Sequence, residues 1–126
     1  MKINGIFVGD HLLADLHGVS ENYLIDPAII ENILNQAALA ANATPIFGKF
    51  HHFGKNSGVT GMLLLKESHI SIHTWPEFSF AAIDIFMCGH CEPKNALELI
   101  KNMMQPLTIN IKNINRGNLI MTDTTV

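Results

Sequence analysis

Apolar residues recur at two different spacings along the chain, and the spacing predicts which segments are helical. Between residues 27 and 42 they fall three and four positions apart, which places them on one face of a helix. Asp26 stands before this segment as a helix cap, and Pro27 occupies the first helical position. Pro93 opens a second segment of the same kind. The remaining pattern predicts strands at residues 9–16, 44–53, 59–66, 68–75, 79–87 and 107–114.

The predicted order is one strand, a helix, four strands, a helix and a last strand. Strands in succession with few helices favour an α+β fold, a two-layer sandwich in which a mainly antiparallel sheet has helices on one face. Residues 62–65 are all apolar, which predicts a central strand covered on both faces. Residues 115–117 are expected to turn into a short tail. The sheet face without helices needs a cover, which a second subunit would supply.

Length and composition predict the number of domains, the oligomeric state and the cellular environment. A length of 126 residues fits a single domain, 1–126. Hydrophobic residues make up 48% and charged residues 15%, so we expect another subunit to cover part of the surface, as in a homodimer. The net charge of −3 and the scattered basic residues predict no nucleic acid or membrane partner. With only two cysteines, we expect a soluble, cytoplasmic protein.

Residues 67–77 read Glu-Ser-His-Ile-Ser-Ile-His-Thr-Trp-Pro-Glu and gather more reactive side chains than any other part of the sequence. The Ser68 hydroxyl can attack the carbonyl of Glu67 through a five-membered ring, so that proximity replaces a bimolecular encounter. This attack turns the peptide bond into an ester, and elimination then divides the protein into chains 1–67 and 68–126. A histidine near its ordinary pKa can serve as the base at neutral pH.

This stretch resembles the self-cleavage site of the bacterial and archaeal S-adenosylmethionine decarboxylase proenzymes. A second stretch, Ala-Ala-Ile-Asp-Ile-Phe-Met-Cys-Gly at residues 81–89, resembles the segment of the same family that carries its catalytic cysteine. The resemblance implies an autoprocessing enzyme in which Ser68 becomes a covalent pyruvoyl group, the cofactor on which the substrate amine is decarboxylated. It also implies the family fold and S-adenosylmethionine as the substrate. The product would then donate aminopropyl groups in spermidine synthesis, and no metal is expected.

The resemblance also implies roles for individual side chains. By that likeness His73 is the processing histidine, Thr60 assists cleavage where the family commonly has a serine, and Cys88 is the proton donor. Phe53 would stack on the adenine, and Glu77 would accept hydrogen bonds from the ribose hydroxyls. These five side chains, with the Glu67–Ser68 bond, form the predicted site.

Two features of the sequence complicate this site. Ser68 and His73 are five positions apart, so they point to opposite faces of a regular strand, and a bend or bulge must intervene if they touch. Asp10 stands where the family often has Arg, which would matter if that segment lies near the substrate. A family member acting on arginine or ornithine would share the same cleavage site, and a carboxylate such as Asp10 would favour a cationic ligand.

Three other functions stay open from the residues. Cys88-Gly-His-Cys91 lies between a predicted strand and a predicted helix, which is the setting of a thiol-disulfide oxidoreductase. The same cysteines with His90 would make an incomplete zinc site. A protein that only binds an adenosyl ligand would keep Phe53 and Glu77 but leave the chain uncut. The sequence assigns no role to His11, His51, His52 and His69.

Overall fold

The computed structural model describes residues 7–119, which form one antiparallel sheet and two longer helices. The elements in chain order are β1 (Phe7–His17), η2 (Glu21–Tyr23), α1 (Pro27–Ala40), β2 (Pro45–His52), β3 (Val59–Leu65), β4 (Ser68–Trp75), η3 (Pro76–Phe78), β5 (Phe80–Cys88), α2 (Pro93–Met104) and β6 (Thr108–Asn118). Every pair of neighbouring strands is antiparallel. The predicted order of strands and helices and the α+β fold class are confirmed.

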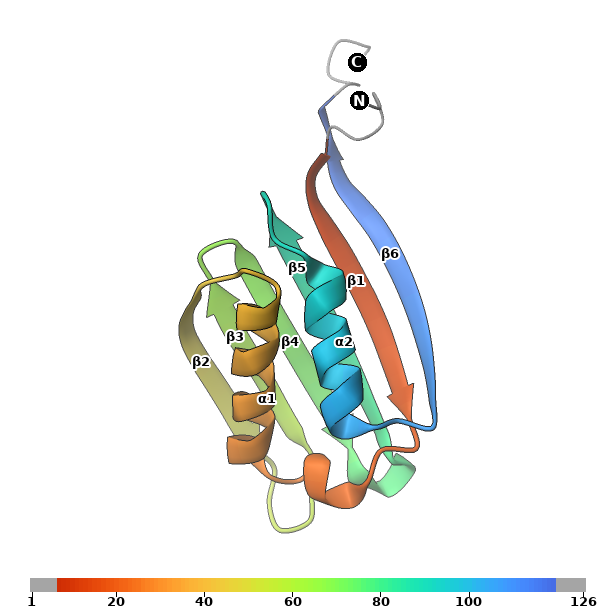
Figure 1. The fold of residues 1–126 in the computed structure, drawn as a ribbon. Helices are drawn as coiled ribbons and strands as arrows, with labels where there is room; N and C mark the ends of the chain where they lie inside the picture. The colour runs from red at the N-terminus through yellow and green to blue at the C-terminus, as the bar shows by residue number, and fades with distance from the viewer. Residues whose placement is uncertain (1–6, 120–126) are drawn as a thin grey trace.

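The sheet has the strand order β2-β3-β4-β5-β1-β6, so β4 lies between β3 and β5 near its middle. Figure 1 shows α1 and α2 side by side across one face of this sheet. Within residues 7–119 no helix lies on the other face, which we call the open face. The molecule therefore has the two layers that the sequence predicts, with helices on one side.

Both helices begin where the sequence predicts, and their apolar faces build the core. The Asp26 carboxylate accepts hydrogen bonds from the N–H groups of Ala28 at 2.9 Å and Ile29 at 3.4 Å, and Pro27 fits the first turn. The buried face of α1 consists of Ile30, Ile33, Leu34, Ala37 and Ala38. These side chains share one core with alternate strand residues such as Ile70, Ile72, Ile83 and Ile85. In the described part of the chain, no helix has the length and apolar run needed to cross a membrane.

One prediction about the strands is untested and one is wrong. Residues 62–65 do lie in β3, where the alternate positions are buried, and Met62 and Leu64 are 41% and 43% exposed on the open face, which the sequence predicts a second subunit to cover. The segment at residues 115–117 does not turn into a tail, because β6 continues to Asn118 and pairs with β1 along almost all of its length. The open face therefore extends over six strands and presents apolar side chains.

Candidate active site

The turn between β3 and β4 places the Glu67–Ser68 peptide bond at one end of the sheet, beside the end of β5. The Glu67 carbonyl oxygen accepts hydrogen bonds from the Cys88 backbone N–H and from the Cys88 thiol, each at 3.2 Å. Ser68 pairs with Met87 in the β4–β5 register, and this brings Cys88 to the carbonyl. Two donors on one carbonyl oxygen stabilise the oxyanion that forms when a nucleophile attacks the carbonyl carbon.

Ser68 has a strained backbone. Its φ angle is 148°, in a region that residues with a side chain rarely adopt. Conformations of this kind cost about 1–3 kcal/mol and persist only where the surrounding structure imposes them. Here Ser68 is paired with Leu65 on one side and with Met87 on the other, so both neighbouring strands hold it. Cleavage of the preceding peptide bond would release this constraint.

The Glu67 side chain is anchored to the segment before β2. Its carboxylate accepts hydrogen bonds from the Thr44 N–H at 3.0 Å and from the Thr44 hydroxyl at 3.3 Å. The backbone hydrogen bond from Thr44 is the main reason why the pKa of Glu67 lies below its usual value. The Lys66 N–H also donates to the Thr44 carbonyl at 2.9 Å. These bonds hold the residue on the amino side of Ser68 in one position.

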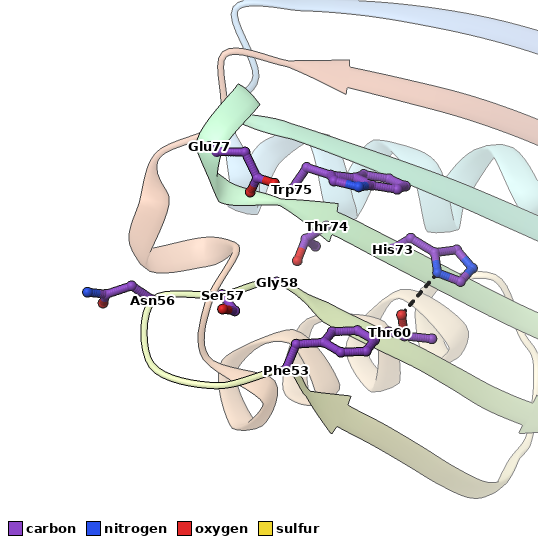
Figure 2. Close-up of a pocket in the computed structure, with 9 residues that line it drawn as sticks. All are labelled: Phe53, Asn56, Ser57, Gly58, Thr60, His73, Thr74, Trp75 and Glu77. Carbon is purple, nitrogen blue, oxygen red and sulfur yellow. Dashed lines mark hydrogen bonds between the residues drawn. The ribbon is translucent and has the colours of Figure 1, made fainter.

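A pocket of about 530 Å³ opens at the other end of β4, beside the loop between β2 and β3. Thr60 and His73 are cross-strand partners, and Thr60 Oγ1 lies 3.2 Å from His73 Nδ1. Figure 2 shows this pair on one side of the pocket, with Phe53 and Glu77 also lining it. The volume lies in the range of pockets that hold small organic ligands.

Trp75 and Thr74 are among the pocket residues for which the sequence predicts no role. Trp75 lies two positions after His73 and therefore on the same strand face. The two-residue alternation of a strand could have predicted from the sequence that Trp75 lies beside His73 in the site. Its ring and that of Phe53 are 37% and 61% exposed, so both present apolar surface to a ligand. Thr74 is buried, and its hydroxyl accepts from a β3 backbone N–H at 2.8 Å and donates to the Leu24 carbonyl at 2.7 Å. Thr74 thus fixes the strand that carries His73.

Ser68 and His73 do not meet within one chain. β4 keeps a continuous register with β3 and β5, so no bulge intervenes between them. They are five residues apart, which is about 16 Å along a strand, and by alternation they belong to opposite faces. We call Glu67, Ser68 and Cys88 the Ser68 end, and Phe53, Thr60, His73, Trp75 and Glu77 the His73 end. The structure groups the predicted site residues into these two clusters and leaves the clusters apart.

The two thiols of the Cys88-Gly-His-Cys91 segment each donate to a backbone carbonyl rather than contacting one another. Both thiols are free, and the Cys91 thiol donates to the Asn42 carbonyl at 3.5 Å. Burial raises the pKa of Cys91, with smaller contributions from Glu67 and Cys88, whereas thiol exchange uses a thiol of lowered pKa. Across residues 7–119, no three or more His, Cys, Asp and Glu side chains are grouped so that they could hold a metal ion.

The remaining polar side chains lie outside the pocket at the His73 end or at its border. Asp10 lines a different pocket, which it shares with Cys91 and the start of α2. The rings of His51 and Phe53 are in edge contact at 4.7 Å, and those of His17 and Phe80 are stacked at 5.0 Å. At the Ser68 end the rings of His11 and His69 both contact Phe86.

Known proteins with similar sequences and structures share one description. Residues 10–117 match the family model for S-adenosylmethionine decarboxylase. The S-adenosylmethionine decarboxylase proenzyme of Methanococcus aeolicus is 40% identical over 114 residues, which cover 90% of this chain and 97% of that protein. A protein of the same name from Caldanaerobacter subterraneus subsp. tengcongensis is 38% identical over 111 residues, 87% of this chain and 89% of that one. The crystal structure of the adenosylmethionine decarboxylase from Aquifex aeolicus has a TM-score of 0.81 and 37% identity, covering 88% of this chain and 92% of that chain.

Proposed function

The chain belongs to the S-adenosylmethionine decarboxylase family, and we propose that it is a self-cleaving, pyruvoyl-dependent enzyme that decarboxylates S-adenosylmethionine. The observation that carries the proposal is the pair of hydrogen bonds from Cys88 to the Glu67 carbonyl, next to the strained Ser68. Self-cleavage before Ser68 needs this arrangement, and self-cleavage creates the group on which decarboxylation depends. The product amine would supply aminopropyl groups for spermidine synthesis.

Self-cleavage follows from the chemistry of the Ser68 end. The Ser68 Oγ attacks the Glu67 carbonyl carbon, and the oxygen that gains negative charge is the one that already accepts two hydrogen bonds from Cys88. Expulsion of the Ser68 nitrogen gives an ester. A base then removes the Ser68 α-proton, the Glu67 carboxylate leaves, and the remaining dehydroalanine hydrolyses to the pyruvoyl group and ammonia. The products are chains 1–67 and 68–126.

His73, the predicted processing histidine, lies at the other end of β4 from Ser68, and we infer that a second copy of the chain brings its own His73 to this bond. Met62, Leu64 and Ile114 are each more than two-fifths exposed, on a face that no helix covers. A two-fold axis through paired open faces would lay the His73 end of one protomer over the Ser68 end of the other. His73, hydrogen-bonded to Thr60, would then act on its partner's Ser68.

After cleavage, the two ends would bind and decarboxylate the substrate together. The pyruvoyl group supplies a ketone that binds the substrate amine and draws away the electron pair left when carbon dioxide departs. The Cys88 thiol, which contacts the Glu67 carbonyl oxygen next to residue 68, donates the proton that the α-carbon then requires. In the pocket, Phe53 stacks on the adenine and Glu77 accepts hydrogen bonds from the ribose hydroxyls.

The pocket also favours this substrate over arginine and ornithine. Phe53 and Trp75 offer exposed rings suited to a purine, and the family to which the chain belongs supports the same choice. Neither small amino acid would use a pocket of about 530 Å³ fully. Two free thiols in residues 7–119 support a reducing compartment, and we propose the cytoplasm.

Mixed variants test both the cleavage and its division between subunits. Purified wild-type protein should separate on a denaturing gel into chains 1–67 and 68–126, and carbon dioxide should be released from S-adenosylmethionine. Ser68→Ala should stay intact and inactive, and His73→Ala should be cut very slowly. When the two variants are co-expressed, the His73→Ala chain should be cut, because its intact Ser68 meets His73 of a Ser68→Ala partner.

Two outcomes would contradict the proposal in different ways. Wild-type protein that stays uncut after prolonged incubation would rule out the pyruvoyl-dependent enzyme. Wild-type cleavage combined with an uncut His73→Ala chain in the mixture would show that His73 acts within its own chain. Equal co-expression of two copies of His73→Ala, each with a different tag, provides the matched control and should give no rescue.

A further inference from the structure

Arg116 places a guanidinium group over the open face at the Ser68 end. Its Cζ lies 5.5 Å from the centre of the Phe86 ring, and its Nη1 lies 3.1 Å from His11 Nδ1. Arginine only donates, so His11 Nδ1 accepts and the ring carries its proton on Nε2. These two contacts orient the Arg116 side chain. Among residues 7–119 the only ion pair joins Lys101 to Glu98, so no carboxylate there neutralises Arg116.

The strand register aligns Arg116 with Cys88. Gly9 on β1 pairs with Arg116 of β6 on one side and with Cys88 of β5 on the other. Gly9 has no side chain to separate them, and a Cβ at this position would collide with the Met87 carbonyl oxygen. The register therefore places Arg116 and Cys88 in one row on the open face, two strands apart, with the edge of the Phe86 ring beside Gly9 between them.

The neighbouring row of side chains contains no Lys or Arg. His11, Phe86 and His69 stand opposite one another on β1, β5 and β4. Burial lowers the pKa of His69 and His11 lowers it further, while Asp84 acts in the opposite direction. Arg116 is therefore the permanent positive charge of this cluster.

We propose that Arg116 binds the carboxylate of the substrate beside residue 68. This inference rests on the proposed function, in which the substrate amine reacts at that residue. The carboxylate is attached to the carbon that carries the amine, so it must lie close to residue 68 whenever the amine reacts. The planar guanidinium fork can give a carboxylate two parallel hydrogen bonds. The ligand class is an α-amino acid with a free carboxylate, which Arg116 distinguishes from the corresponding amine.

This role predicts an effect on binding more than on the rate of the bound complex. The carboxylate loses its charge as carbon dioxide forms, so Arg116 stabilises the bound substrate at least as strongly as the transition state. Interactions of that kind lower KM without raising kcat. A hydrogen-bonded charge pair changes affinity by about ten- to a hundredfold.

Arg116→Gln separates this role from a structural one. We expect normal self-cleavage, a KM for S-adenosylmethionine raised about ten- to a hundredfold, and a kcat that is unchanged or higher. Binding of decarboxylated S-adenosylmethionine, followed through the fluorescence of Trp75, should be the same as in wild type because this ligand has no carboxylate. Arg116→Lys keeps the charge without the fork and should give an intermediate KM. Lys112→Gln removes a charge from the same strand and should leave KM unchanged.

The results of these experiments would distinguish a failure of the Arg116 role from a failure of the proposed function. An unchanged KM in Arg116→Gln, or an equal loss of affinity for the decarboxylated amine, would overturn the role of Arg116 while leaving the proposed function intact. Wild-type protein that releases no carbon dioxide from S-adenosylmethionine would instead overturn the proposed function. Reduced self-cleavage in Arg116→Gln together with Arg116→Lys would assign Arg116 to folding of the Ser68 end rather than to substrate binding.

Discussion

The Ser68 end and the His73 end lie on the same strand but are built differently. At the Ser68 end, backbone pairing holds the strained Ser68, and the Glu67 carbonyl accepts hydrogen bonds from the N–H and the thiol of Cys88. At the His73 end, side chains surround an open pocket, and the reactive pair is a hydroxyl 3.2 Å from an imidazole. The Ser68 end holds the bond to be cleaved, whereas the His73 end holds the predicted processing histidine.

Under the proposed function, this difference would make a single protomer an incomplete enzyme. Continuous pairing on both sides of β4 keeps the two ends apart, and no local adjustment of a regular strand would bring them together. The proposed pairing of two open faces would remove the separation without a change of strand register, because each copy would contribute what the other lacks. The comparison therefore predicts that variants at the two ends have separable effects.

Cys88→Ala should produce the largest difference between the effects on decarboxylation and on self-cleavage, because Cys88 has a different role in each reaction. Loss of the proton donor should lower decarboxylation about 10²–10⁴-fold. Self-cleavage should slow by about tenfold or less, because a thiol is a weak donor and the backbone N–H still binds the Glu67 carbonyl. Gel densitometry gives the cleavage rate, and release of labelled carbon dioxide gives the turnover of the fully cleaved protein.

Cys91→Ala is the matched control for that experiment. Cys91 binds the Asn42 carbonyl on the other side of the Cys88-Gly-His-Cys91 segment and contacts no group of the Ser68 end through a hydrogen bond. Both rates should stay near the wild-type values. Loss of activity in Cys91→Ala with activity retained in Cys88→Ala would reverse the assignment and point to thiol chemistry.

The sequence could predict the parts of this site but only some of their arrangement. Helix starts at Asp26 and Pro27 and the alternation within strands are local properties, and they were correct. The approach of Cys88 to Glu67 depends on the β4–β5 register, which local periodicity does not determine. Arg116 fell in a segment predicted to be a turn, because pairing with β1 stabilises a strand through Gly117 that its own residues do not favour.

Thr60 tests whether the His73 end acts on cleavage at all. Thr60→Val keeps the shape of the side chain but removes the hydroxyl that lies next to His73 Nδ1. A neutral hydrogen bond contributes about 1 kcal/mol, so cleavage should slow about fivefold. Thr60→Ser keeps the hydroxyl and should cleave at the wild-type rate. Identical cleavage time courses for Thr60→Val and wild type would remove Thr60 from the processing reaction.

His69 and His73 offer the smallest and most specific test, because they lie on the same strand face at different ends. Burial places the pKa of His69 below its usual value of 6.5, so the unfolded chain binds a proton that the folded protein excludes. Above pH 6.5 the neutral His69 contributes its full share to the free energy of unfolding. This contribution is lost as the pH falls through the pKa that His69 has in the folded protein. His69→Gln removes this dependence, so urea midpoints of the variant should fall less than those of wild type between about pH 7 and pH 5. His73→Gln, a substitution of the same kind at the exposed end of the strand, is measured in parallel as the control for loss of a histidine. If the urea midpoints of His69→Gln and wild type fell equally with pH, the folded protein would bind a proton at His69 as readily as the unfolded chain does.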